Sequence, residues 1–494
     1  MDAALPVESL LRTRARGAGG IALMPLALPL GLLFSLLFGV MIWMLPAPFV
    51  VAAAIGIVAV ATIIRRPVRG LLLFCLIGTF LPYSTIQIGI RTTVSEALIM
   101  LTWASYLLHA VFQERHRVPH MLRPERLLVA LMLFSAFPFL VGQLTVIAEG
   151  NGPINWVRWL FNLSILFLVP RLLTDLKTLE NAVIALLGGT LLLLVLSIGV
   201  YVTKGSATAI IPILGSLGYS GADVLSESLL SFASRMGSPW MHPNVAGGAL
   251  AMLLPLAFCF GMTRSGTARR LGLAVAALGV VGLLLTGSRG ALLSLIAVML
   301  LMARRRIPHL GRLLMGGMVA GILLLMFYPP LQDRLMGLFS NDDASTAIRF
   351  LEYSHFPDAV ATFPFGIGFK TDPPVLGYTE FGISNLWLNF IYKIGIPGML
   401  LFIAITLSWW KEVRPGSGRV VLTRENAIAL GCTTGVLAAL FSGLFDHYFS
   451  FTSVLVALFW LLLGISLHET RRLRARPDMT SRHLDASPEP GASS

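Results

Sequence analysis

The chain has 494 residues, of which 56% are apolar and only 12% are charged, and its formal net charge is +13. Soluble domains are roughly a quarter charged, so this composition excludes an ordinary soluble enzyme and predicts an integral membrane protein. The positive charge would suit a nucleic-acid partner. However, the basic residues form short clusters between apolar runs, which argues against nucleic-acid binding.

Apolar runs, most of them of about 17 to 24 residues and long enough to cross a bilayer, recur from one end of the chain to the other. About fourteen runs predict an all-α fold, a polytopic integral membrane helical bundle of about 14 transmembrane helices. We predict one membrane domain over residues 1–470 and a disordered cytoplasmic tail at 477–494. The runs lie near residues 21–45, 47–64, 70–89, 94–112, 127–147, 153–170, 181–203, 243–263, 271–287, 290–303, 313–329, 386–410, 425–445 and 451–468.

The basic residues predict the orientation of this bundle. They cluster between alternate runs, and 28 of the 37 Lys and Arg residues fall on one side of the predicted membrane. The positive-inside rule makes that side cytoplasmic, so we expect both termini in the cytoplasm. The remaining basic residues then lie on the outer side: Arg91, Arg158, Lys204, Arg235, Arg289, Arg334, Arg349, Lys370 and Lys393.

The first outer segment of interest runs from about residue 204 to residue 244. It ends in SRMGSPWMHPN, which brings Arg235, His242 and Asn244 to the mouth of a predicted span. A histidine beside a proline is more often structural than catalytic, so His242 has both interpretations. No histidine pair or carboxylate cluster has metal-ligand spacing, and nucleotide-binding glycine motifs are absent from the sequence. We therefore predict neither a metal nor a cofactor.

Arg289 stands in a turn between two apolar runs, in the segment LLLTGSRGALLSL. Gly287 and Gly290 allow a tight reversal that leaves backbone N–H groups free at a helix start, where anions bind. An arginine beside such a turn suits a phosphate clamp. The alternative is a hairpin arginine whose side chain extends to the lipid headgroups.

The longest polar stretch between apolar runs extends from about Asn341 to Gly398, roughly 55 residues, and loops of that length are usually functional. We predict a catalytic outer loop at 330–385. Capping residues precede ASTAIRFLEYSHFPDAV, which predicts an amphipathic helix with Arg349, Glu352 and two aromatic residues on one face. The alternative for Arg349 and Glu352 is an ordinary surface ion pair.

Four segments of the second half together resemble the O-antigen ligase and polymerase superfamily, which comprises polytopic enzymes of bacterial surface polysaccharide assembly. In chain order they are MHPNVAGGALAMLLPL, LLLTGSRGALLSL, IRFLEYSHFPDAVATFPFGIGF and SNLWLNFIYKIGIPGMLLF. The resemblance covers about residues 235–465 and depends on the order, spacing and shared outer placement of these segments. The first half of the chain agrees only in its hydropathy.

The resemblance implies a concrete activity. The donor would be a glycan on undecaprenyl diphosphate, transferred without a metal at the outer face of the bacterial cytoplasmic membrane. Arg289 and Arg349 would bind the diphosphate, and a histidine would assist the acceptor hydroxyl. The implied partners, besides membrane lipid, are a flippase and a chain-length regulator.

The chain departs from the family's ligase signature at one position. That signature is His, Asn, nine residues, Gly, two residues and Gly; here it is occupied by Ser384, Asn385, Gly395 and Gly398, so a serine stands where the family has histidine. Serine is no general base at neutral pH without a neighbouring base. The substitution therefore favours a repeat-unit polymerase over a ligase.

The candidate site residues follow from these segments. As catalytic residues we predict Arg289, Arg349, Glu352, Ser384 and Asn385. As substrate-binding residues we predict Arg235, His242, Asn244, Lys370, Asp372, Asp446 and His447. The outer-side candidates for the missing base are His242, Glu352, His355, Asp358, Asp372, Asp446 and His447.

Three other functions remain open. A ligase would transfer finished polymer to an acceptor. A transporter or flippase of lipid-linked oligosaccharide would suit the same number of spans, but transporters usually place ionisable groups at the midplane of broken helices in repeated halves, whereas this chain gathers them in one outer loop. An inactive assembly partner would keep the fold without the catalytic histidine.

Overall fold

The structure is a computed structural model. It describes residues 47–112, 120–146, 151–219, 234–303, 344–370, 383–415 and 420–475, apart from 89 and 452, with six single helical residues outside these ranges (35, 39, 230, 316, 319 and 326). The chain divides into two compact units, Met1–Arg65 and Arg66–Ser494. Helix α4 (Ala47–Arg65) belongs to the first unit. All other elements described below belong to the second.

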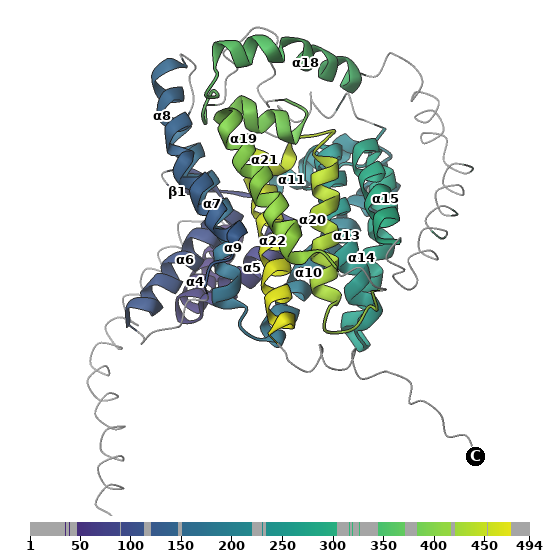
Figure 1. The fold of residues 1–494 in the computed structure, drawn as a ribbon. Coiled ribbons are helices and arrows are strands. Elements are labelled where there is room, and N and C mark those ends of the chain that lie inside the picture. Colours follow the sequence, from purple (N-terminus) through teal and green to yellow (C-terminus); the bar gives the residue numbers. More distant parts are fainter. Residues whose placement is uncertain are drawn as a thin grey trace, which may run out of the picture. The chain divides into compact units, whose positions relative to one another are not determined.

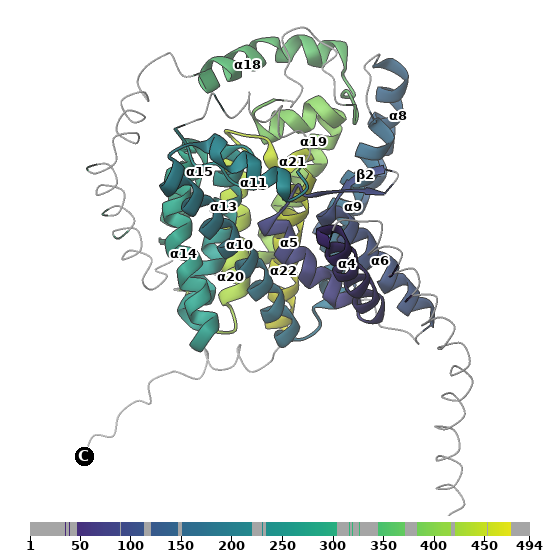
Figure 2. The same ribbon diagram turned by 180° about the vertical axis from the view of Figure 1, so that it is seen from behind.

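The second unit is a bundle of helices, which confirms the predicted all-α class (Figure 1 and Figure 2). Its elements are α5 (Pro67–Phe80), β1 (Thr85–Ile88), β2 (Ile90–Thr93), α6 (Val94–Phe112), α7 (Arg123–Phe134), α8 (Ala136–Thr145), α9 (Gly152–Leu172), α10 (Leu176–Lys204), η1 (Ala207–Ile210), α11 (Ile211–Ser216), α13 (Pro243–Thr263), α14 (Gly266–Thr286), α15 (Arg289–Ala303), α18 (Ala344–Thr362), α19 (Leu386–Val413), α20 (Ala427–Ser442), α21 (Tyr448–Phe451) and α22 (Ser453–Arg474).

Eight described helical segments are long and apolar enough to cross a membrane, which confirms a polytopic membrane protein. They are Val94–Phe112, Arg123–Thr145, Gly152–Leu172, Leu176–Lys204, Pro243–Thr263, Gly266–Thr286, Leu386–Val413 and Val454–Arg474. Shorter apolar helices cover four more predicted runs, those of α4, α5, α15 and α20. The predicted runs at 21–45 and 313–329 lie outside the described residues, and so does the predicted tail at 477–494.

The run predicted near residues 70–89 does not form one helix. α5 ends at Phe80, and Leu81 has the non-helical angles φ −126° and ψ 63°. Leu81 precedes Pro82, and a residue before proline is disfavoured in the helical region. β1 and β2 then form an antiparallel hairpin that pairs Thr85 with Thr93. Its β-branched residues suit a strand better than a helix.

Helices α13 and α22 are the most deeply enclosed of the candidate spans. In the apolar stretches of these two helices 89% and 83% of the residues are buried, against 28–50% in the other six. α13 packs against α14 and α20, and the approach to α20 is very close. A Cβ added at Gly435 of α20 would lie 2.1 Å from the carbonyl oxygen of Met252. Small residues at such contacts let helices in a membrane approach closely, so the start of α13 rests on a tightly packed support.

Helix α18 crosses one end of the bundle, above α19 (Figure 1). The loop that follows α18 is anchored to a break in α19, where Ile394 and Gly395 have non-helical angles. The break frees backbone carbonyls, and the amides of Ile367 and Gly368 donate to the carbonyls of Tyr392 and Lys393, both at 2.9 Å. This backbone pairing fixes the C-terminal end of α18 to α19.

Gly395 makes that pairing possible. Its φ is +74°, a conformation that glycine adopts without steric cost. An added Cβ would also lie 3.0 Å from the backbone of Phe365 in the anchored loop. The first glycine of the sequence signature therefore has a structural reason: it lets the loop after α18 lie directly against the broken helix.

Candidate functional site

The predicted amphipathic helix is α18, and its predicted face contacts the rest of the protein. Glu352 is only 2% exposed, whereas Phe350 on the opposite side is 78% exposed. Phe356 packs on a small apolar cluster that includes Ile383 and Tyr392. Arg349 and Glu352 therefore lie on the side of α18 that faces the bundle, as their spacing predicts.

Two side chains of α18 hold the backbone of Ser384. An Oε of Glu352 accepts a hydrogen bond from the Ser384 amide at 2.8 Å, and the hydroxyl of Tyr353 donates to the Ser384 carbonyl at 3.0 Å. The position at which the family signature has histidine thus lies directly under α18. Because two partners fix its backbone, this position is held firmly at the beginning of α19.

Asn385 caps α19. Its Oδ1 accepts from the amides of Trp387 and Leu388 at 3.0 and 3.1 Å, and its Nδ2 donates to the carbonyl of Leu444 at 3.1 Å. Asparagine is among the preferred N-cap residues for this reason. The same side chain therefore starts α19 and ties it to the turn that follows α20.

That turn carries Asp446, which is 8% exposed and faces Arg349. Nη2 of Arg349 lies 3.8 Å from Oδ2 of Asp446. The hydroxyl of Tyr448 donates to the same oxygen, and the amide of His447 donates to Oδ1 at 3.2 Å. Nε of Arg349 is buried and has no hydrogen-bond partner among the described residues. Arg349 therefore has an N–H donor that Asp446 does not bind.

The start of α13 joins the same network. Nη1 of Arg235 donates to Oδ1 of Asn244 at 2.9 Å, and the side chain of Asn244 also hydrogen-bonds Tyr448. His242 is the N-cap of α13, and its Nδ1 accepts from the Asn244 amide at 3.1 Å. Burial and, secondarily, the charge of Arg349 lower the pKa of His242 to about 4, so this histidine is neutral at neutral pH.

Arg289 is the first residue of α15. Gly287, with φ +60°, ends α14 and makes the tight reversal that the sequence predicts. The start of α15 lies against the turn after α20, because a Cβ on Gly290 would meet the side chain of Phe445 at 2.7 Å. The charge of Arg349 also acts on Arg289. Arg289 and Arg349, the two arginines predicted to bind the diphosphate, are therefore close enough to interact electrostatically, beside the turn that carries Asp446.

One predicted residue that the structure describes, Lys370, is not part of this network. Nζ of Lys370 donates to the carbonyl of Val146, and the carbonyl of Lys370 accepts from Nζ of Lys393. These bonds hold the loop after α18 in place. Asp372 lies outside the described residues.

His447 lies beside Asp446, with its Nδ1 3.7 Å from Oδ1 of Asp446. Sequence analysis did not single out Tyr448, which connects the start of α13 to Asp446. The signal was present, because a buried tyrosine hydroxyl usually has a hydrogen-bond partner, and this tyrosine directly follows Asp446-His447.

The electrostatics of the cluster differ from those of a metal site. Among the described residues, no group of three or more His, Cys, Asp or Glu residues could hold a metal ion. Burial raises the pKa of Asp446 to about 7, and the hydrogen bond from Tyr448 and the charge of Arg349 oppose that rise. The cluster thus combines two arginines suited to an anion with a carboxylate that changes protonation near neutral pH.

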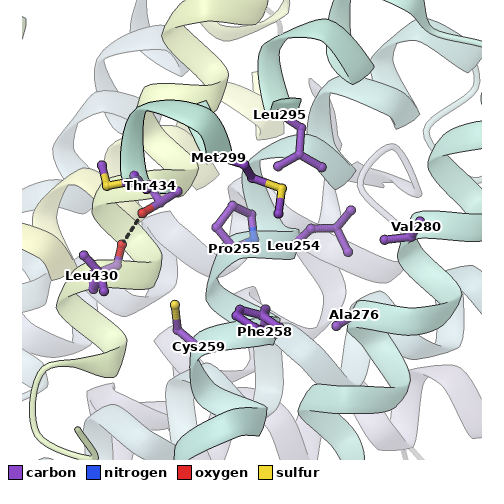
Figure 3. A pocket seen from close by; sticks show the side chains of 11 residues that line it. Leu254, Pro255, Phe258, Cys259, Ala276, Val280, Leu295, Met299, Leu430 and Thr434 are labelled. Carbon is purple, nitrogen blue, oxygen red and sulfur yellow. Dashed lines mark hydrogen bonds between the residues drawn. The ribbon is translucent and has the colours of Figure 1, made fainter. Parts of the chain in front are cut away.

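An apolar groove lies along α15 on the side of α13, α14 and α20 (Figure 3). On α15 it is lined by Leu295, Met299 and Met302, and it begins about 9 Å from Arg289 at 1.5 Å per residue. Thr434 also lines it, but the Thr434 hydroxyl donates to the carbonyl of Leu430 at 2.8 Å. The groove therefore presents an apolar surface near the arginine pair.

Residues 273–403 match the family model of the O-antigen ligase. The matched segment contains most of α14, all of α15 and α18, and the first part of α19, and so includes Arg289, Arg349, Glu352 and Ser384. No curated protein matches the chain.

Proposed function

Starting from the O-antigen ligase and polymerase superfamily, which the match of residues 273–403 supports, we propose that this chain is a membrane glycosyltransferase that polymerises repeat units. The donor would be an oligosaccharide on undecaprenyl diphosphate. The acceptor would be a hydroxyl of another repeat unit, and the product a surface polysaccharide. The reaction would take place at the outer face of the cytoplasmic membrane.

The observation that carries this proposal is the convergence of Arg289 and Arg349 from distant parts of the chain. When the sugar–oxygen bond breaks, negative charge develops on the leaving diphosphate. Preorganised positive donors in a partly dehydrated site stabilise such charge more strongly than water does. Nε of Arg349, buried without a hydrogen-bond partner among the described residues, supplies one such donor.

The groove beside α15 supports a lipid-linked donor in particular. Its lining is apolar, and Met299 and Met302 are flexible enough to adapt to a branched isoprenoid chain. A diphosphate at Arg289 would place the attached lipid within reach of the groove. The headgroup would then occupy the polar cluster while the tail stays among the helices.

Ser384 supports polymerase over ligase activity. Where the ligase signature has histidine, this chain has a serine whose backbone is held by Glu352 and Tyr353. The backbone of position 384 is thus held at the start of α19, but its side chain has no imidazole. A polymerase that joins repeat units would also work with a flippase and a chain-length regulator.

The test is polysaccharide output from a deletion strain of the source bacterium complemented at matched expression. We expect Arg289→Ala and Arg349→Ala to lower polymerisation by about 10²–10³-fold each and to accumulate single lipid-linked repeat units. Lys204→Ala, an exposed basic residue at the end of α10, is the matched control and should polymerise normally.

Each alternative has its own signature in this experiment. Long polymer that stays on the lipid carrier would indicate a ligase. Repeat units trapped on the cytoplasmic face would indicate a flippase. Normal polymer from both arginine variants would refute the diphosphate clamp.

A further inference from the structure

The proposed reaction needs a group that takes a proton, and the histidine of the ligase signature is absent. We propose that the carboxylate of Asp446 accepts the proton of the acceptor hydroxyl, in place of that histidine. This inference rests on the proposed function and adds a catalytic residue to it. Among the described residues, four of the predicted candidates lie around the arginine pair: His242, Glu352, Asp446 and His447.

The position of Asp446 suits the role. It faces Arg349 at 3.8 Å, and its side chain remains 11% exposed. Phe445, its neighbour in the chain, lies against the start of α15, next to Arg289. A donor diphosphate held by the two arginines would therefore place its anomeric carbon near this turn, and an acceptor hydroxyl approaching that carbon would come close to the carboxylate.

Asp446 also has capacity left to accept a hydrogen bond. A carboxylate offers about four lone-pair positions, and the hydrogen bonds from Tyr448 and from the His447 amide use two of them. Arg349 is too far away, at 3.8 Å, to form a hydrogen bond of ordinary length. A hydroxyl group of the acceptor can therefore bind to the carboxylate without displacing either donor.

His242 is excluded as the base by its tautomer. Its Nδ1 accepts a hydrogen bond from the Asn244 amide, so the proton of the neutral ring resides on Nε2. A ring in this state presents an N–H donor on its other side and has no lone pair there to take a proton.

Glu352 has a structural function instead. Its carboxylate accepts the Ser384 amide at 2.8 Å, and the residue is only 2% exposed. The bond couples α18 to the beginning of α19, so that Arg349, one helical turn away, stays over the cluster. Glu352 is therefore a positioning residue.

The proposed step is balanced in atoms and charge. The acceptor oxygen forms a bond to the anomeric carbon while the bond from that carbon to the phosphate oxygen breaks. The electron pair of the broken bond leaves with the lipid diphosphate, where Arg289 and Arg349 stabilise it. The hydroxyl proton passes to Asp446, which returns it to water after the product leaves.

The protonation behaviour of Asp446 agrees with this geometry. Its pKa of about 7 reflects burial, which raises it. The hydrogen bond from Tyr448, the charge of Arg349 and the His447 amide lower this pKa, and the charge of Glu352 raises it. Because the deprotonated carboxylate is the active form, the rate should fall as the pH drops below about 7.

The experiment uses full-length protein in proteoliposomes with lipid-linked repeat units extracted from the deletion strain. We expect Asp446→Asn to lower kcat by about 10²–10⁴-fold, to leave KM for the donor nearly unchanged and to abolish the inflection near pH 7. Asp446→Glu should restore part of the rate. Tyr448→Phe removes a hydrogen bond to the carboxylate and should move the inflection to higher pH.

Two controls keep the outcome decisive. Asp175→Asn, at an exposed helix cap where asparagine serves equally well, should retain the full rate. His447→Gln should keep the inflection. If His447→Gln removes it, or if Asp446→Asn polymerises normally, Asp446 is not the base. An inactive wild-type protein would overturn the proposed function itself.

Discussion

The carboxylates of Glu96 at the start of α6 and of Asp446 in the turn after α20 each face an arginine, but their surroundings differ. Arg158 donates to Oε2 of Glu96 from Nε at 2.9 Å, and its Nη2 lies 2.8 Å from the same oxygen. Thr93 and Asn162 add further hydrogen bonds to this carboxylate. Arg349 approaches Asp446 only to 3.8 Å, and its Nε has no hydrogen-bond partner among the described residues.

This difference separates an ion pair that protein groups satisfy fully from one that they satisfy only in part. Glu96 belongs to α6, and its donors come from the hairpin and from α9, so the ion pair joins three elements and has little capacity for anything else. The described protein groups satisfy the pair of Arg349 and Asp446 less completely. A buried donor without a protein partner makes a ligand-binding role a testable hypothesis, which burial of charge alone does not.

The largest effect on stability should come from Glu96→Ala. Removal of one partner from a buried pair costs about 3–5 kcal/mol, and because Arg158 is 24% exposed we expect the lower end, about 3 kcal/mol. Thermal unfolding in detergent would measure this loss. Polymerisation per folded molecule should stay near wild type, whereas Arg349→Ala should show the reverse behaviour.

The control for this prediction is an exposed pair. Arg474 and Glu412 are 58% and 30% exposed, and an exposed pair contributes about 0–1 kcal/mol. Glu412→Ala should therefore hardly change the unfolding temperature. A loss of turnover in folded Glu96→Ala equal to that of Arg349→Ala would remove the distinction between the two ion pairs.

A smaller effect is expected at the break in α19. Gly395→Ala would put a side chain at φ +74° and 3.0 Å from the backbone of Phe365. A strained backbone of this kind costs about 1–3 kcal/mol. The loop after α18 would then separate from α19, so the rate should fall together with the stability, because α18 carries Arg349.

The matched control is Gly199→Ala in α10. A Cβ there would meet nothing within 4 Å, and alanine in a helix is favoured over glycine by about 0.5–1 kcal/mol. We expect an unchanged or slightly raised unfolding temperature and a normal rate. If Gly395→Ala also behaved in this way, the backbone pairing between the loop and α19 would not position the site.

The sequence predicted what the bilayer and helical periodicity impose. A membrane helix must satisfy its backbone internally over a fixed length, and the eight described helical segments that could cross a membrane accordingly fall on the apolar runs. The face of α18 that bears Arg349 and Glu352 follows from residues three apart lying together on a helix. The hairpin after α5 was missed because hydropathy does not register Pro82, whose effect on Leu81 ends that helix.

Contacts between distant segments were beyond the reach of the sequence. Lys370 and Asp446 are both polar residues next to apolar runs, and nothing local distinguishes them. In the fold, Lys370 donates to a backbone carbonyl, whereas Asp446 faces Arg349. Tertiary packing decides which of two similar residues joins the cluster, and an isolated run of sequence carries no information about that packing.

The smallest predicted effect separates the role of Glu352 from that of Asp446. Tyr353→Phe removes one hydrogen bond to the Ser384 carbonyl, worth about 0.5–1.5 kcal/mol, so we expect a rate about 2- to 10-fold lower, measured as kcat in proteoliposomes.

Glu352→Gln keeps an amide oxygen that can accept from the Ser384 amide, and should lower the rate no more than Tyr353→Phe does if Glu352 only positions α18. A loss as large as that of Asp446→Asn would instead make Glu352 the proton acceptor. The functional carboxylate would then be the buried one on α18, and incomplete satisfaction of Asp446 would no longer distinguish the catalytic charge from the structural one.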